Sequence, residues 1–258
     1  MEHRFTTRVL GRHTAAFDLC RGCEFLQARD PFWLAEAYSR PISLLDTGLV
    51  GRNLAVASRL AKVLQFGLHE QVEGVYLDYA GGYGLLTRLM RDRGFDFYWA
   101  DKYAENLFAR GFEYQSGMEP CRAVTAIEVL EHSVNPIEIV SVAMRMGQSN
   151  VLLVSTELFI APPPEPSAWW YYAFETGQHI SFFTENTLRA LAKRSGLKVA
   201  ALSGFHIFYR GNLVVPLPWT TRWRRALTAR LRGPHLRSRT MGDHLRLAAQ
   251  LREGKASD

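Results

Sequence analysis

One short stretch decides the fold: residues 77–84, which read Leu77-Asp78-Tyr79-Ala80-Gly81-Gly82-Tyr83-Gly84. It places a cluster of glycines between a short apolar run, which predicts a strand, and residues 85–93, which predict a helix. Gly82 and Gly84 permit a tight turn and let a ligand come close to the backbone where the helix begins. The stretch therefore predicts a ligand-binding turn, and a turn without any ligand is the alternative.

Strands and helices alternate outward from this turn. Further strands are predicted over residues 95–100, 123–129, 151–155, 199–205 and 207–215, and further helices over 51–67, 104–110, 136–146 and 184–195. Repeated strand–helix–strand units predict an α/β fold with a doubly wound, mostly parallel, Rossmann-like sheet. The last two strands lie close together in the sequence, so they predict an antiparallel C-terminal strand and the one antiparallel pair.

The net charge of +6 is concentrated at one end of the 258-residue chain. Residues 219–258 hold ten Lys/Arg and three Asp/Glu, whereas the rest of the chain holds 21 Lys/Arg and 22 Asp/Glu and is nearly neutral. The charge of the main domain therefore gives no support to nucleic-acid binding. Three cysteines, the lack of an apolar signal core and the lack of a ~20-residue apolar run predict a soluble, cytoplasmic protein.

The chain divides into three predicted parts. Residues 1–48 form an N-terminal extension, expected to be helical, that contains Cys20-Arg21-Gly22-Cys23. Residues 49–218 form the main domain, and residues 219–258 form a basic tail. Apolar residues recur every four positions in the tail and predict an amphipathic helix: Trp219, Trp223, Leu227 and Leu231. The tail is either a solvated helical face or a contact for an anionic membrane surface or an acidic partner.

The spacing of Cys20 and Cys23 is that of half a zinc knuckle. Structural zinc needs four ligands, and the segment before the pair adds only His3 and His13. We expect two free thiols that pack in the extension, with His13 and the pair as the alternative metal site.

Two acidic residues narrow the choice of ligand at the glycine turn. Asp78 ends the strand before the turn, and Asp101 ends the next strand, 23 residues later. That distance is close to the ~20 residues expected for an acid that accepts hydrogen bonds from ribose hydroxyls. A dinucleotide site usually has the pattern G-x-G-x-x-G, whereas the pattern here is Gly82-x-Gly84. A nucleoside cofactor other than a dinucleotide is therefore favoured.

With these residues in place, residues 77–84 resemble motif I of the class I S-adenosylmethionine-dependent methyltransferases, D-x-G-x-G-x-G. The resemblance continues through residues 123–132 and 177–184 and covers about residues 70–215, within the main domain. It implies the seven-stranded methyltransferase sheet of that class. It also implies a set of cofactor-binding residues, with Asp101 on the ribose: Asp78, Ala80, Gly81, Gly82, Gly84, Asp101 and Glu128. Ala80 replaces a glycine of the motif, which is tolerated if its φ is not positive.

A second cluster of polar residues lies in Glu128-Val129-Leu130-Glu131-His132. Glu128, Glu131 and His132, with His179 from a distant loop, make an oxygen and nitrogen set that suits Mg²⁺, Mn²⁺ or Zn²⁺. The pattern resembles that of the small-RNA 3′-terminal 2′-O-methyltransferases and the ubiquinone-pathway O-methyltransferases, which implies a divalent ion on adjacent substrate hydroxyls. A metal-free site is equally open, with His132 or His179 as the general base beside Glu131.

Four adjacent aromatic residues, Trp169-Trp170-Tyr171-Tyr172, are candidate substrate-binding residues. They follow the proline-rich residues 161–166 and cannot all face one way, so we expect some of them to line a cleft. Aromatic faces suit sugar rings or flat acceptors, and ordinary core packing is the alternative.

These features predict an S-adenosylmethionine-dependent O-methyltransferase for a small hydroxylated acceptor. A sugar unit of a surface polysaccharide, a glycolipid or a secondary metabolite is the favoured acceptor, with or without a divalent metal ion. The alternatives are C- or N-methylation, RNA 2′-O-methylation, and a non-catalytic methyltransferase-like binding protein.

Overall fold

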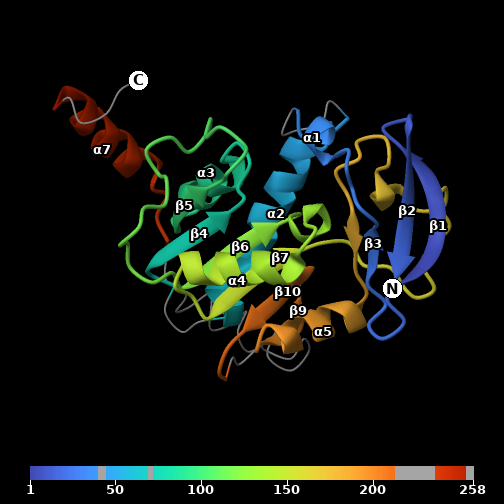
Figure 1. Cartoon of the computed structure of the whole chain (residues 1–258). Helices are drawn as coiled ribbons and strands as arrows, with labels where there is room; N and C mark the ends of the chain where they lie inside the picture. The colour runs from blue at the N-terminus through green and yellow to red at the C-terminus, as the bar shows by residue number, and fades with distance from the viewer. Residues whose placement is uncertain (40–44, 69–71, 213–235, 254–258) are drawn as a thin grey trace. The chain divides into compact units, whose positions relative to one another are not determined.

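The computed structural model describes residues 1–39, 45–68, 72–212 and 236–253 (Figure 1). The helix predicted over residues 219–231 lies outside these residues. The chain divides by its internal contacts into two compact units. The first unit comprises Met1–Thr47, Ala126–Arg145 and Val151–Arg210, and the second comprises Gly48–Thr125, Met146–Asn150 and Gly211–Asp258. Within the described part of the chain, no helix combines the length and apolarity needed to cross a membrane.

A six-stranded sheet has the order β5-β4-β6-β7-β10-β9. Its strands are β4 (Val75–Tyr79), β5 (Asp96–Ala100), β6 (Ala123–Ile127), β7 (Val151–Ser155), β9 (Lys198–Leu202) and β10 (Phe205–Tyr209). β4 pairs in parallel with β5 and β6, whereas β10 is antiparallel to both β7 and β9. The predicted α/β fold with a mostly parallel sheet and an antiparallel C-terminal strand is therefore confirmed.

The described residues form six strands in this sheet, one fewer than the seven that the resemblance implies. At the outer edge of β5, a single parallel bridge joins Trp99 to Glu113. The backbone of Trp99 accepts from Tyr114 at 2.7 Å and donates to Phe112 at 2.8 Å. Residues 112–114 thus run beside β5 at this edge of the sheet.

Two predicted helices of the second unit are confirmed. α2 (Leu49–Val63) continues into a π-helical turn, η1 (Leu64–Leu68), and α3 (Leu85–Asp92) follows the glycine turn. Each buries one apolar stripe, which includes Leu60 in α2 and Met90 in α3. Only residues 80–84 separate the end of β4 from the start of α3, so the glycine turn is held between two regular elements.

Residues 104–110, predicted as a helix, form turns instead. The N–H groups of Leu107 and Phe108 both donate to the carbonyl of Tyr83 in the glycine turn. The side chain of Asn106 accepts from another N–H of this segment at 2.9 Å. Because these donors are already used, the hydrogen-bond ladder of a helix does not form here.

A second sheet lies in the first unit and has the order β1-β2-β3-β8 (Figure 1). All its pairs are antiparallel, and its strands are β1 (Glu2–Val9), β2 (His13–Leu19), β3 (Leu26–Ala28) and β8 (Ser181–Phe182). The expectation of a helical N-terminal extension is therefore wrong, apart from the single turn α1 (Leu34–Ala37). Alternate residues of β2, Ala15 and Phe17, are buried, which is strand periodicity. The expectation of a single antiparallel pair is also wrong, because all pairs of this sheet are antiparallel and β10 is antiparallel to β7 as well as to β9.

The described part of the first unit also contains four further helices. η2 (Leu130–His132) follows β6, α4 (Pro136–Met146) follows η2, and η3 (Trp170–Tyr172) precedes β8. α5 (Glu185–Arg194) begins after Thr184, whose hydroxyl accepts from the N–H of Thr187 at 3.1 Å. Thr184 is thus the predicted N-cap.

Cys20 and Cys23 carry free thiols in the turn between β2 and β3. His13, the alternative third ligand, instead contacts Glu36 at 2.9 Å through Nε2. The favoured interpretation, two thiols that pack in the extension without a metal ion, stays a prediction.

The described part of the basic tail contains one helix, α7 (Thr240–Arg252), in the second unit. Buried Asp243 accepts from both Nε and Nη2 of buried Arg91 in α3, each at 2.8 Å. Arg91 also pairs with Asp96 of β5 at 2.7 Å, and its guanidinium lies over the ring of Phe112. These contacts fix α7 to α3 and β5, whereas contact of the tail with a membrane or an acidic partner stays a prediction.

Candidate functional site

The glycine turn is anchored by a buried carboxylate. Asp78, near the end of β4, accepts from the hydroxyl of Thr87 in α3 and from that of Thr125 in β6, both at 3.0 Å. Burial raises the pKa of Asp78 to about 6, against the effect of these two hydrogen bonds. Sequence reasoning missed both threonines, although each lies beside a motif that it identified.

Three residues of the turn have positive φ: Ala80 at 55°, Gly82 at 54° and Gly84 at 82°. The condition under which alanine would be tolerated at position 80 is therefore not met. A Cβ at Gly84 would come within 2.6 Å of Asn106 Oδ1, so both its conformation and its surroundings require glycine. A Cβ at Gly82 would meet nothing within 4 Å, so the turn faces open space there.

Asp101 lies directly after β5 and contacts the same turn. Its Oδ2 accepts from the N–H of Gly82 at 2.9 Å, and its Oδ1 accepts from Tyr103 and Ala104. Trp99 in β5 adds a bond from Nε1 to the Gly82 carbonyl at 2.8 Å. A carboxylate oxygen has a second lone pair, so Asp101 keeps the capacity to accept from a ribose hydroxyl. The second unit thus brings together the residues predicted for the cofactor, apart from Glu128.

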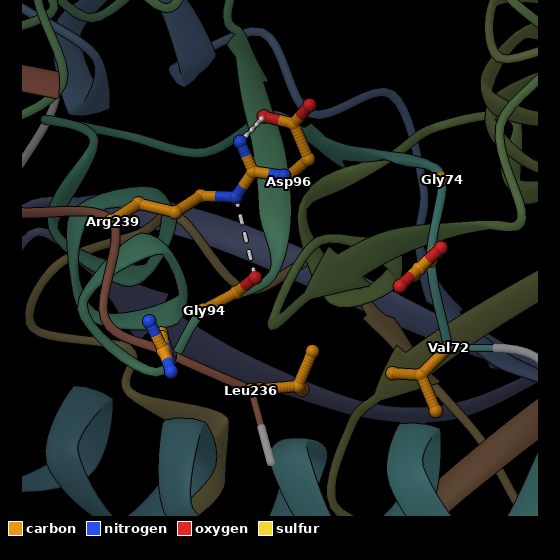
Figure 2. Close-up of a pocket in the computed structure, with 8 residues that line it drawn as sticks. Val72, Gly74, Gly94, Asp96, Leu236 and Arg239 are labelled. Atoms are coloured by element: carbon orange, nitrogen blue, oxygen red, sulfur yellow. Dashed lines mark hydrogen bonds and ion pairs between the residues drawn. The ribbon is translucent and has the colours of Figure 1, made fainter. Parts of the chain in front are cut away.

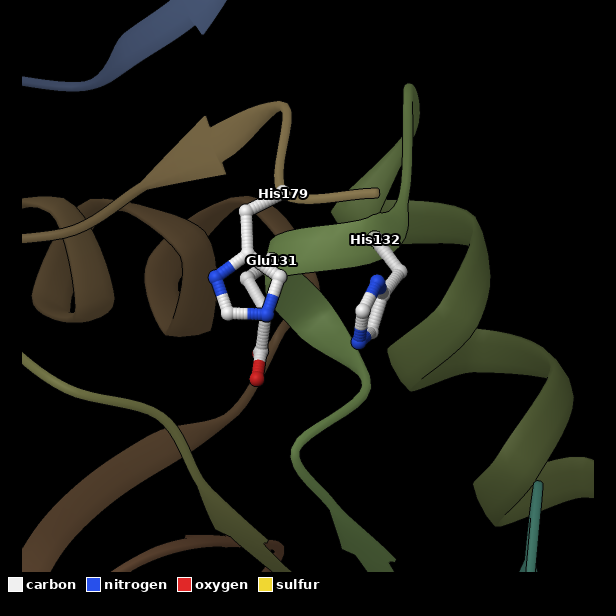
Figure 3. Close-up of side chains that lie close together, drawn as sticks. All are labelled: Glu131, His132 and His179. Atoms are coloured by element: carbon white, nitrogen blue, oxygen red, sulfur yellow. The ribbon is translucent and has the colours of Figure 1, made fainter. Parts of the chain in front are cut away.

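A second group forms within the first unit, where Glu131, His132 and His179 converge (Figure 3). One ligand atom from each lies within 4.8 Å of the others. Nδ1 of His132 lies 3.0 Å from the carbonyl of Gln178, and Nδ1 of His179 lies 2.7 Å from the carbonyl of Tyr171. A carbonyl oxygen can only accept a hydrogen bond, so the ring nitrogen beside it is the donor, and each neutral imidazole has its proton on Nδ1 and its lone pair on Nε2.

Glu131 is fully buried beside these imidazoles. Its Oε1 accepts from the hydroxyl of Tyr171 at 2.6 Å, while its buried Oε2 has no hydrogen-bond partner among the described residues. Burial raises the pKa of Glu131 well above its ordinary value, and the nearby charge of Glu128 raises it further. A buried carboxylate oxygen without a donor is costly, so this position suits a cation or a proton.

Glu128 lies beside this group but is not one of its three members. Its Oε1 accepts from the hydroxyl of Ser155 at 2.6 Å, and its Oε2 lies 2.9 Å from the hydroxyl oxygen of Tyr171. Its φ of 54° is unusual for a residue other than glycine and marks a constrained position. Of the four predicted metal ligands, the structure therefore brings three together, and it places Glu128 with hydroxyl donors.

The four adjacent aromatic residues have different surroundings. Trp170 is 79% exposed, whereas Tyr171 and Tyr172 are buried. The Trp169 ring packs on the Phe182 ring, and the Tyr172 hydroxyl donates to the carbonyl of Pro164. Tyr171 alone of the four contacts the carboxylates, through a hydroxyl that also lies 3.2 Å from that of Thr156. Polar residues directly after the apolar run of β7, Ser155 and Thr156, were the missed signal for these contacts.

A pocket of about 400 Å³ lies elsewhere in the second unit, at the amino ends of β4 and β5 (Figure 2). Figure 2 shows Arg239 reaching Asp96 and the carbonyl of Gly94, at 3.3 and 3.2 Å. The glycine turn follows the carboxyl end of β4, where ligands bind in parallel sheets. The pocket is therefore separate from the predicted cofactor site.

Comparison with protein families matches residues 52–202 to a methyltransferase domain. The match spans more than half of the chain, so the chain belongs to this methyltransferase family. The matched family is that of the class I S-adenosylmethionine-dependent methyltransferases. No protein among those of curated function matches it.

Several solved structures are similar to the chain. One is an O-methyltransferase family 2 protein from Planctomyces limnophilus in complex with apigenin, with 19% identity, a TM-score of 0.46, and coverage of 64% of this chain and 60% of that chain. Another is magnesium protoporphyrin IX methyltransferase from Synechocystis PCC 6803 with bound SAH, with 15% identity, a TM-score of 0.40, and coverage of 69% and 93%. The chain spans 60% of the length of the first structures that it matches.

Proposed function

We propose that the protein transfers a methyl group from S-adenosylmethionine to a hydroxyl of a small acceptor. The orientation of His132 and His179 is the observation that carries this proposal. Both rings have Nδ1 held by a backbone carbonyl and a lone pair on Nε2, beside the buried carboxylate of Glu131. A hydroxyl acceptor must lose its proton at neutral pH. This group of residues can take up that proton or stabilise the negative charge left on the acceptor oxygen.

On the donor side, we propose that the glycine turn, Asp78 and Asp101 hold the cofactor. The open space in front of Gly82 allows close approach to the backbone, and Asp101 at the end of β5 accepts from the ribose. When bound, S-adenosylmethionine supplies a methyl group on a positively charged sulfur. Methyl transfer then depends mainly on in-line positioning of the acceptor oxygen.

On the acceptor side, we propose that Glu131, His132 and His179 hold a divalent cation. One carboxylate and two imidazoles suit Mn²⁺ or Zn²⁺, and a cation would give the buried Oε2 of Glu131 its missing partner. Such an ion would lower the pKa of an acceptor hydroxyl. Glu128 supports the site through Ser155 and Tyr171 rather than by ligation.

For the acceptor, we favour a sugar unit of a surface polysaccharide, a glycolipid or a secondary metabolite. The exposed ring of Trp170 offers an aromatic face to a sugar ring or a flat acceptor. A cytoplasmic location fits this proposal, because S-adenosylmethionine is the methyl donor and the three cysteines are free thiols.

Calorimetry with S-adenosylmethionine, followed by a screen of hydroxylated acceptors with a labelled methyl donor, tests the proposal. We expect cofactor binding, and label on an acceptor that disappears when its hydroxyl is replaced by hydrogen. Absence of cofactor binding at millimolar concentration would contradict catalysis. Label that persists on the deoxy acceptor would instead indicate C- or N-methylation.

A further inference from the structure

Tyr171 contacts the acceptor-side residues through two different atoms. Its hydroxyl lies 2.6 Å from Glu131 Oε1, 2.9 Å from Glu128 Oε2 and 3.2 Å from Thr156 Oγ1. Its backbone carbonyl lies 2.7 Å from Nδ1 of His179. One residue thus contacts both glutamates and one histidine of the candidate site.

We propose that Tyr171 is a positioning residue that holds Glu131 and His179 in the arrangement that binds a divalent cation. This inference rests on the proposed cation at Glu131, His132 and His179, and it replaces the role in substrate stacking predicted for Tyr171. Tyr171 acts through the orientation of the ligands and does not itself bind the ion.

The surroundings of Tyr171 keep its hydroxyl in place. The side chain is 2% exposed, and its ring packs against Trp169 and His179 with centroids 5.4 and 4.6 Å away. A buried aromatic ring with these neighbours has little freedom to rotate, so its hydroxyl is fixed between the two glutamates. The backbone of the same residue fixes His179, which couples the positions of a carboxylate ligand and an imidazole ligand.

The charges explain why this hydroxyl matters. Glu128 and Glu131 both approach one phenol oxygen, which has a single proton and can donate to one carboxylate at a time. The hydroxyl binds Oε1 of Glu131 and so directs Oε2 to the side where it has no donor. Without the hydroxyl, Oε1 also loses its donor, and the two carboxylates are free to move apart. The ligand arrangement would then have to be built during ion binding, which lowers affinity.

Tyr172 provides a matched control within the same segment. It is also a buried tyrosine of η3, but its hydroxyl donates to the carbonyl of Pro164 at 2.8 Å and contacts neither glutamate. Replacement of Tyr172 by Phe therefore removes a buried hydroxyl of the same kind without touching the ligands.

Titration of the full chain with Mn²⁺ by calorimetry tests this inference on wild type, Tyr171→Phe and Tyr172→Phe. We expect Tyr171→Phe to weaken Mn²⁺ binding by about 10–100-fold. Tyr172→Phe should match wild type, and S-adenosylmethionine should bind all three proteins equally. Equal Mn²⁺ affinity in wild type and Tyr171→Phe would overturn the role of Tyr171 and leave the proposed cation intact. Absence of Mn²⁺ binding to wild type would overturn both, and S-adenosylmethionine binding separately tests the donor side.

A double variant decides the case in which Tyr171→Phe does not fold alone. Glu128→Gln replaces one carboxylate by a neutral amide and removes the repulsion that Tyr171 restrains. If Tyr171 holds the two carboxylates together against their repulsion, Tyr171→Phe combined with Glu128→Gln should recover a cooperative melting transition. Failure of the double variant to fold would mean that Tyr171 serves core packing alone, which contradicts the inference.

Discussion

Ala80 and Glu128 both have positive φ, at 55° and 54°, although neither is glycine. Each lies at or just past the end of a parallel strand, Ala80 after β4 and Glu128 after β6. Non-glycine residues pay a steric cost in this conformation, and such residues gather where the surrounding structure holds a functional geometry. Ala80 has only a methyl side chain, so its strain can be removed without loss of any hydrogen bond.

Ala80→Gly should raise the free energy of unfolding by about 0.5–1 kcal/mol. Glycine removes a steric cost of about 1–2 kcal/mol and loses part of that gain through the entropy of the unfolded chain. Urea denaturation measures the change. Ala55→Gly, at an exposed position inside α2, is the control and should lower stability by about 1 kcal/mol. A loss of stability in both variants would contradict the assigned strain.

Asp78 should make stability depend on pH. Its pKa is raised from 3.8 to about 6 in the folded protein, so the folded state binds the proton more tightly than the unfolded state. Asp78 therefore lowers the free energy of unfolding as pH rises from about 4 to about 6, and this cost is complete above pH 6.

Asp78→Asn should accordingly stabilise the protein at pH 8 by up to about 3 kcal/mol, at 1.36 kcal/mol for each pKa unit. The amide can still accept from one of the two threonines and donate to the other. Denaturant titrations at pH 4 and pH 8 measure the difference, which should be small at pH 4. An effect of equal size at both values would show that Asp78 does not titrate in this range.

Among the elements, α7 depends on an unusual buried ion pair. Arg91 is 1% and Asp243 is 6% exposed, and two hydrogen bonds of 2.8 Å join them. A buried arginine that loses its partner keeps the cost of desolvation without the compensating attraction. α7 is therefore held to α3 in part by a buried charge pair, and loss of this pair should lower stability strongly.

Asp243→Ala should lower the free energy of unfolding by about 3–5 kcal/mol, because it leaves Arg91 buried with fewer partners. The exposed pair of Glu185 and Arg189 in α5 is the control, and Glu185→Ala should cost about 0.5 kcal/mol or less. Thermal and denaturant unfolding compare the two variants. Similar small effects would mean that α7 contributes little to the stability of the second unit.

The elements also show which features the sequence could predict. α2, α3 and the strands of the parallel sheet follow from local periodicity, since each buries one face in its own segment. The N-terminal sheet could not be predicted in the same way, because β3 pairs with β8, which lies more than 150 residues later. Residues 104–110 keep a helical pattern but lose their N–H groups to Tyr83 and to side chains.

The same reasoning applies to the candidate site. Motif spacing predicted Asp78, Asp101, Glu131, His132 and His179 as chemically important, and the structure places each beside other members of its group. Motif spacing could not predict the surroundings of Glu128, because the residues that contact its two oxygens, Ser155 and Tyr171, come from other segments of the chain. The hydroxyl partners of buried carboxylates depend on tertiary contacts and leave little trace in spacing.

For the whole molecule, residues assigned to the donor and the acceptor are joined along the chain through β6. Thr125, which binds Asp78, and Glu128 are three residues apart in sequence. We propose one chemical role for each group: the glycine turn holds the methyl donor, and Glu131 with the two histidines prepares the acceptor hydroxyl.

This assignment predicts that removal of divalent ions lowers the rate of methyl transfer. A chelator such as EDTA should lower methyl transfer by about 10-fold or more and leave S-adenosylmethionine affinity unchanged, because the ion acts on the acceptor hydroxyl. Addition of Mn²⁺ should restore transfer. Full activity in the chelated protein would support direct proton removal by His132 or His179 in place of a metal ion.

Methyl transfer to an acceptor hydroxyl is tested most directly by NMR of the product formed with ¹³C-methyl S-adenosylmethionine and an acceptor found by screening. We expect a labelled methyl group on oxygen in the wild-type product. Glu131→Gln should form that product ~100-fold more slowly, because activation of the acceptor hydroxyl is lost. A methyl group on carbon or nitrogen would contradict O-methylation, and equal rates for the two proteins would contradict the role proposed for Glu131.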